Sequence, residues 1–155
     1  MNQKEFINLV IVNQLGDIVK LHPYLSFGLI ATGIEFLGAC IDNHHVQKSF
    51  ESGDRFRNAI FKLFPEKYHQ FAKKNSTYDL YTELRCGMNH CFLPKSKIDL
   101  SERKSSHIHL SLVNNSLVLL AEDLFSDLQN AALAVIEMMK NGMIPEKFQL
   151  DVGEN

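Results

Sequence analysis

The amino-acid sequence predicts a mainly α-helical fold: an up-and-down bundle of about five helices with a small β-hairpin before the last helix. Three observations predict this class. Apolar residues recur at intervals of three and four over several long segments, which is the period of an amphipathic helix. One short stretch instead alternates apolar and polar residues, as a strand does. The composition, 45% apolar and 22% charged over 155 residues, fits one soluble globular domain, which we place at 1–144, with a polar tail over 145–155.

The first two helices are predicted over 4–20 and 24–42, and His22-Pro23 separates them. The second is apolar nearly all round, so it should be the central helix, and its small residues allow neighbouring backbones to come close. Glu35 interrupts its apolar run short of the ~18 residues that a membrane span needs. We therefore expect a buried helix and no membrane association.

A third helix is predicted over 51–64 and a fourth over 77–93, where Thr77 is the expected N-cap. The core face of the fourth helix is predicted from residues that recur at three and four positions: Leu80, Leu84, Gly87, Met88 and Cys91. Arg85 and His90 lie on this helix, outside that face.

The chain then turns polar over 94–106. A β-hairpin is predicted from the alternating segment 107–113, the turn Asn114-Asn115 and the apolar run 117–120. His107 and His109 share one face of the first strand, where we expect them at an exposed sheet edge. The last helix follows over 123–140.

Charge and cysteine content narrow the class of protein. The net charge of −2 argues against a broad basic surface for long nucleic acid, but it allows a local positive pocket. Three cysteines, an odd number, favour a reducing compartment, and the N-terminus lacks secretory-signal features, so we expect a cytoplasmic protein. No metal or other cofactor is expected, because the candidate ligands match no established spacing: Asp42, His44, His45, His90 and Cys91.

Arg85 and His90 are the candidate catalytic residues, since a guanidinium holds phosphate and an imidazole titrates near neutral pH. At ~100° per residue, measured from Leu84, Arg85 lies at about +100° and His90 at about −120°, on opposite sides of the core face. Cys86 and Asn89 lie between them on the outward side, as candidates for substrate binding. The spacing therefore favours a composite site between two copies related by a twofold axis, and hence a homodimer.

The same residues also have a structural explanation. Arg85 is then a solvated or ion-paired residue, and His90 is a helix C-terminal histidine that the helix dipole favours. Glu35, an acid within an apolar helix, is in this case the partner of Arg57 or Arg85 and not a catalytic base. Both explanations stay open on the sequence alone.

The string from Leu80 to His90, with Pro94 shortly after it, resembles the late helix of the HEPN superfamily. The signature of these helical domains is an arginine, four to six intervening residues and a histidine; here four residues separate Arg85 from His90. The resemblance in helix order covers most of the chain. It implies a helical bundle that often dimerises and, in active members, a metal-independent endoribonuclease with the arginine and histidine of both subunits in one cleft. The position after the arginine, commonly polar in active members, is Cys86 here.

Three functional hypotheses follow. The first is a ribonuclease of toxin or defence type, in which His90 accepts the proton of an RNA 2′-hydroxyl while Arg85 holds the phosphate. The second is a non-catalytic dimeric module that binds RNA, a nucleotide or a protein through the same cleft. The third is a structural adaptor in which these residues only pack. Besides a second copy, RNA and a protein such as an antitoxin are the expected partners.

Overall fold

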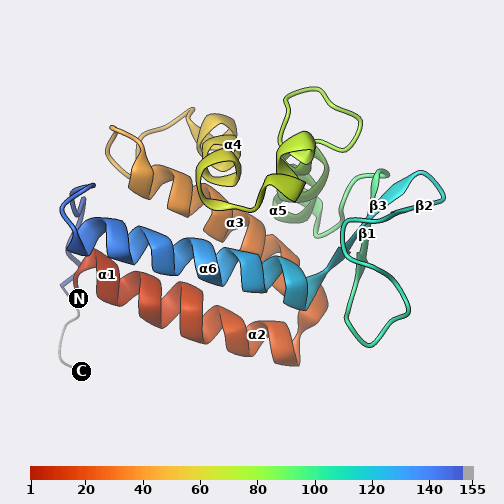
Figure 1. Cartoon of the computed structure of the whole chain (residues 1–155), viewed down its shortest axis with the longest axis horizontal. Coiled ribbons are helices and arrows are strands. Elements are labelled where there is room, and N and C mark those ends of the chain that lie inside the picture. Colours follow the sequence, from red (N-terminus) through yellow and green to blue (C-terminus); the bar gives the residue numbers. More distant parts are fainter. Residues whose placement is uncertain (152–155) are drawn as a thin grey trace.

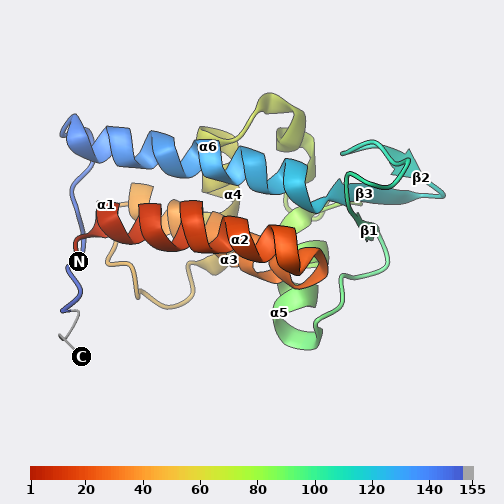
Figure 2. The ribbon, with the colours of Figure 1, turned by 90° about the horizontal axis from the view of Figure 1, so that it is seen from below.

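The computed structural model describes residues 1–151. It confirms the predicted fold class: 58% of the chain is helical, and a small sheet precedes the final helix. The long N-terminal helix and the final helix lie side by side and run in opposite directions (Figures 1 and 2). The sheet lies at the end of the molecule away from both termini (Figure 1).

The N-terminal helix (3–21) joins three segments without a break: α1 (Gln3–Phe6), the π-helical η1 (Ile7–Gln14) and α2 (Leu15–Leu21). Asn2 and Glu5 form a capping box at its start, which satisfies otherwise free backbone N–H groups. The buried side of this helix includes Ile7, Ile11, Leu15 and Val19. A spacing of four residues places these side chains on one face of the helix.

The central helix is α3 (Pro23–Ile41), which packs against the N-terminal helix, against α4 (Ser52–Leu63) and against α6 (Ala121–Lys140). Pro23 occupies its first turn, where a missing N–H costs nothing. By length and composition alone α3 could cross a membrane. However, 56% of its apolar window is buried inside the structure, as in the core helix of a bundle.

After α4, a 3₁₀ segment, η2 (Glu66–Phe71), leads to a helix made of the π-helical η3 (Tyr81–Cys86) and α5 (Gly87–Cys91). The expected N-cap at Thr77 is wrong. The carboxylate of Asp79 instead accepts hydrogen bonds from the Tyr81 N–H and the Thr82 hydroxyl, and the helix begins after it.

The expected core position of Cys91 is also wrong. The other four residues of the predicted core face are buried, but Cys91 is exposed. The chain leaves the helix at Phe92, which has a left-handed φ of 57°, and turns away before Cys91 can be covered.

The sheet has three strands in the order β1-β3-β2. The predicted hairpin corresponds to β2 (Leu112–Val113) and β3 (Ser116–Leu120), and the strand β1 (Ile98–Ser101) pairs in parallel with β3. The first hairpin strand was expected from residue 107, but Leu110, at φ 62°, breaks the extended backbone. His107 and His109 therefore lie in a loop and not on a strand.

The segment predicted as a polar tail, 145–155, packs onto the bundle over its described part. Phe148 stacks edge-on against Phe6, at 5.7 Å between ring centroids, and lies 6.3 Å from the ring of Phe36. Gln149 forms a bridge with Asn2. These contacts join the two ends of the described chain.

Candidate functional site

The helix that carries the Arg/His motif is attached to α3 by three hydrogen bonds. Arg85 Nε donates to Glu35 Oε2 at 2.7 Å, and Asn89 Nδ2 donates to Thr32 Oγ1 at 3.1 Å. The Tyr24 hydroxyl donates to the Phe92 carbonyl at 2.8 Å. The partners descend along α3 as the numbers rise along α5, so the two helices run antiparallel.

Arg85 makes its ion pair inside the chain. Its side chain and that of Glu35 are 19% and 20% exposed, and the guanidinium lies 5.8 Å from the centre of the Tyr81 ring. Arg57, the other partner considered for Glu35, binds Asp79 instead, at 2.6 Å. Within a single chain, therefore, Arg85 is an ion-paired residue, as the structural explanation of the motif expected.

The structure brings Arg85 and Asn89 together on the α3 side of the motif helix and leaves His90 apart from them. His90 is exposed to solvent, and Cys86 is half-buried. The guanidinium contacts a carboxylate and not the imidazole. One copy of the chain thus does not place the two candidate catalytic groups around a common phosphate.

A broad apolar surface lies next to this helix. Six large apolar side chains, at the end of α2, at the start of α3 and directly after α5, are between 44% and 72% exposed: Leu21, Tyr24, Leu25, Leu29, Phe92 and Leu93. We call these residues, together with Gly28 and Thr32 between them, the α3 face. An exposed patch of this kind commonly marks an interaction site.

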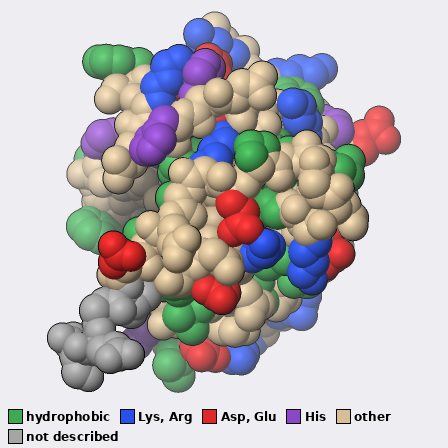
Figure 3. All heavy atoms as spheres, turned by 90° about the vertical axis from the view of Figure 1, so that its left-hand side faces the viewer, with side chains coloured by type: hydrophobic (Ala, Val, Ile, Leu, Met, Phe, Trp, Pro, Cys, Tyr) green, Lys and Arg blue, Asp and Glu red, His purple; other side chains and the backbone are tan. Residues whose placement is uncertain are grey.

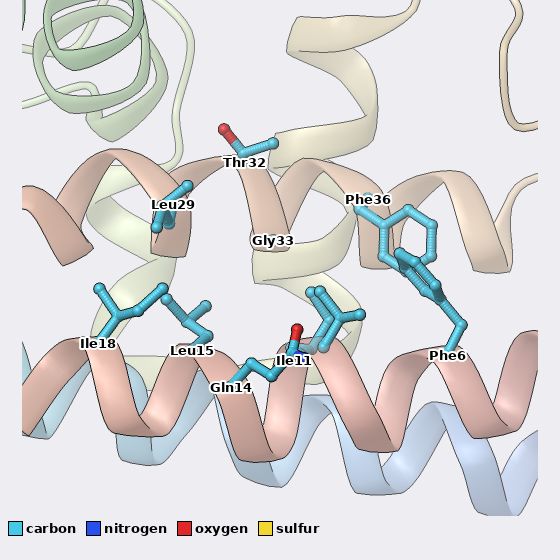
Figure 4. A pocket seen from close by; sticks show the side chains of 10 residues that line it. Phe6, Ile11, Gln14, Leu15, Ile18, Leu29, Thr32, Gly33 and Phe36 are labelled. Atoms are coloured by element: carbon cyan, nitrogen blue, oxygen red, sulfur yellow. The ribbon is translucent and has the colours of Figure 1, made fainter. Parts of the chain in front are cut away.

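Two hollows flank the α3 face. One, of about 320 Å³, lies between α3 and the N-terminal helix, with Ile18 and Leu29 toward one end and Phe6 and Phe36 toward the other (Figure 4). The second, of about 430 Å³, lies between α3 and α5 and is bordered by Asn89 and Phe92. Leu29 and Thr32 border both, and no residue lining either hollow is charged.

The end of the molecule that carries both termini looks different. Hydrophobic, charged and histidine side chains are interspersed there (Figure 3). Asp42, Arg55 and Lys147 form a buried ionic cluster in this region, with Asp42–Arg55 and Asp42–Lys147 distances of 2.7 Å. Burial by itself raises the pKa of Asp42, but the hydrogen bonds from Lys147 and Arg55 outweigh it and hold that pKa below its usual value.

The charged groups of this cluster pair with one another. Within residues 1–151 no group of three His, Cys, Asp or Glu side chains is placed to hold a metal ion.

The amino-acid sequence also contains an indication of the α3 face, which is independent of the Arg/His motif. Leu25 and Leu29 lie one turn apart on a helix whose apolar character extends nearly all round, and Leu21 ends the preceding helix four residues before Leu25. Such a helix is expected to be covered on every side. In the structure, the described elements cover only part of α3, so its exposed side was not expected from the sequence.

No protein-family model, curated protein or solved structure matches this chain.

Proposed function

We propose that this chain is a cytoplasmic, HEPN-like module without catalytic activity, which forms a homodimer through the α3 face. The observation that carries the proposal is the uncharged, exposed apolar surface on both sides of Leu29. Apolar surface left in water is unfavourable, and its burial against a matching surface drives association.

The extent of the surface supports a specific interface. Its six exposed side chains present on the order of 600 Å², against the ~800 Å² that each partner contributes to a standard interface. Half-buried neighbours such as Phe36 and Ile18 adjoin it at the first hollow. The patch is thus close to the size that a stable dimer needs.

The charge of the surface favours a second copy over nucleic acid. RNA binding relies on cations that contact phosphates, and the residues lining the two hollows include none. Two identical copies, each of net charge −2, meet here without like charges in contact.

The state of Arg85 supports a non-catalytic role. To hold a phosphate in a shared cleft, its guanidinium would have to leave Glu35, whose carboxylate is four-fifths buried. Removing one member of such a pair is costly because the other charge stays in a poorly solvated place. Glu35 would also repel an incoming phosphate.

The dimer is tested by light scattering across a concentration series. We expect the wild-type chain to form a dimer and Leu29→Glu to form a monomer, because the substitution places a charge in the apolar interface. Leu112→Glu is the matched control: Leu112 is 57% exposed on β2, outside the α3 face, and its substitution should leave the dimer intact. A wild-type chain that remains monomeric at high concentration would overturn the proposal.

The ribonuclease hypothesis keeps one observation in its favour, the exposed imidazole of His90. It is tested by incubating single-stranded RNA with the wild type and His90→Ala in the presence of a chelator. We expect no difference between the two. Cleavage that disappears in the folded His90→Ala variant would replace the non-catalytic proposal with the catalytic one.

A further inference from the structure

A third hollow, of about 300 Å³, shares no residue with the α3 face and, unlike the two hollows beside that face, has charged residues in its lining. Three parts of the chain border it. The first turns of α4 contribute Gly53 and Arg57, the turn that follows η2 contributes Lys74, and η3 contributes Tyr81. Neither the Arg85/His90 motif nor the proposed dimer uses this hollow.

The guanidinium of Arg57 is held at the edge of this hollow by its own chain. Its Nη2 donates to Asp79 at 2.6 Å, and its central carbon lies 4.9 Å from the centre of the Tyr81 ring. A Cβ atom on Gly53 would lie 2.8 Å from Nη1 of Arg57, so glycine leaves the space that the guanidinium occupies. Within residues 1–151, Nε has no hydrogen-bond partner. Arg57 is therefore a positioned cation whose donors Asp79 uses only in part.

Phe50, at the border of the same hollow, has an unfavourable backbone and an unfavourable environment. Its φ is 65°, which a bulky residue rarely adopts, and its side chain is fully exposed. An aromatic ring in water gains nothing from packing within the chain. A strained residue of this kind is typical of sites where the chain contacts a ligand. The ring of Phe50 is thus available to an apolar group from outside.

The charges in the lining define what the hollow can accept. Besides Arg57, it is lined by Lys74 and Asp54, which are both exposed and form no ion pair within the described part of the chain. Two cations and one carboxylate suit a ligand with a single negative charge better than a phosphate dianion. Asp54 also offers an acceptor to a positive group on the same ligand.

We infer that this hollow binds a free α-amino acid with an aromatic or large apolar side chain. Arg57 and Lys74 bind its carboxylate, Asp54 binds its ammonium group, and the side chain packs against the ring of Phe50. The volume is at the lower end of the range for ligand pockets, about 300–1,000 Å³, which suits a ligand of this size. The inference goes beyond the proposed dimer and does not depend on it.

The site is tested by titrating the ¹⁵N-labelled full chain with L-phenylalanine and following the amide signals by NMR. A ligand of about twelve heavy atoms, bound with ordinary efficiency, has a dissociation constant of about 1 mM. We expect saturable shifts at the amides of Gly53 and Asn75, which border the hollow, and none at Leu29 on the α3 face. Two further probes are 3-phenylpropionate, which lacks the ammonium group, and phenethylamine, which lacks the carboxylate.

Substitutions of exposed residues assign each contact while the fold is monitored by circular dichroism. We expect Asp54→Asn to raise the dissociation constant for L-phenylalanine about fivefold and to leave that for 3-phenylpropionate unchanged. Lys74→Met should weaken both of these ligands and leave phenethylamine unaffected. Lys73→Met is the matched control, because Lys73 is also exposed but does not line the hollow, and it should bind all three probes as the wild type does.

Three results would overturn the inference. The first is the absence of saturable shifts at Gly53 with L-phenylalanine at about ten times the expected dissociation constant. The second is a wild-type constant for L-phenylalanine in both Asp54→Asn and Lys74→Met. The third is tighter binding of inorganic phosphate than of L-phenylalanine, which would assign the hollow to a phosphate ligand. None of these results bears on the dimer, whose test is the oligomeric state.

Discussion

Arg85 shows how the surroundings of one side chain decide what a motif can do. The planar guanidinium suits a phosphate, but in this chain its Nε–H is directed at Glu35 and its face lies near Tyr81. Asn89, one turn further on, is likewise bonded to α3. Two of the four predicted site residues therefore hold the motif helix in place, and only the remaining two, Cys86 and His90, are free of these contacts to α3.

Loss of the Arg85 side chain should therefore affect stability. We expect Arg85→Ala to lower the free energy of unfolding by about 1–3 kcal/mol, since Glu35 would be left without its partner at a mostly buried position. His90→Ala, at an exposed position, should change it by no more than about 0.5 kcal/mol. Urea titrations followed by circular dichroism measure both; equal effects would contradict the structural role of Arg85.

At the scale of elements, His109 joins three parts of the fold. Its Nδ1 accepts the Leu120 N–H at 2.9 Å, where β3 passes into α6, so the ring proton of the neutral form is on Nε2, 2.7 Å from the Tyr68 hydroxyl of η2. That hydroxyl donates in turn to Asp127 of α6 at 2.6 Å. The loop before β2 is thus attached to the bundle through an uncharged imidazole.

This arrangement predicts a loss of stability in mild acid. Burial lowers the pKa of His109 from 6.5 to about 4, although Asp123 and Asp127 nearby oppose the shift and Lys67 and Arg103 reinforce it. The unfolded chain then binds the proton more readily, so the stabilisation is complete above pH 6.5 and is lost as the pH falls toward 4.

We expect a loss of order 1 kcal/mol in this window, allowing for partial exposure of the ring, measured as the difference in urea midpoint between pH 7 and pH 4.5. His109→Gln should show a smaller difference. The carboxylates with lowered pKa values contribute mainly as the pH falls below their usual values, which are 3.8 for Asp42 and Asp123 and 4.5 for Glu51. An identical pH profile for the two proteins would refute the assignment.

The helices could be predicted from the sequence because apolar residues repeat at helical spacing over long segments, as in α3 and α6. The strand β1 was not, since only Ile98 and Leu100 alternate within a polar stretch, too few residues to distinguish a strand from a loop. The π-helical turns of η1 and η3 also left no signal in the spacing. At the site, helical geometry predicted different sides for Arg85 and His90, and in the structure Arg85 pairs with Glu35 while His90 is exposed. The uncovered side of α3 depends on which elements pack against it, and periodicity does not specify that.

At the scale of the whole molecule, Lys147 fastens the C-terminal segment to the end of α3. Its side chain is 9% exposed, and its ammonium donates to the carbonyls of Asp42 and His44, at 2.7 and 2.9 Å, and to the carboxylate of Asp42. A cation at this end complements the helix dipole, and its hydrogen bond to the Ala39 carbonyl, at 2.5 Å, satisfies a group in the last turn of α3 that has no partner within the helix. The predicted tail is therefore part of the structural framework.

We expect Lys147→Met, which keeps the aliphatic stem and removes the charge, to lower the free energy of unfolding by about 2–4 kcal/mol. Lys140→Met is the control, because Lys140 pairs with Glu137 on the surface of α6 and should contribute less than about 1 kcal/mol. Chemical denaturation of both variants gives the comparison. If the two substitutions lower the free energy of unfolding equally, the buried ammonium of Lys147 does not stabilise the fold more than a surface ion pair does.

The hydrogen bond from the Lys147 backbone to the Gln3 side chain, at 2.6 Å, spans 144 positions of the chain. During translation at ~5–20 residues per second, Lys147 is therefore synthesised roughly 7–30 s after Gln3. Once α6 is complete at Lys140, the helices can pack before residue 147 is available, and the carbonyls that Lys147 later contacts at the end of α3 are then left to water. A chain that ends before residue 147 would contain every helix of the bundle but none of these contacts, so we expect proteases to cleave it faster than the full chain.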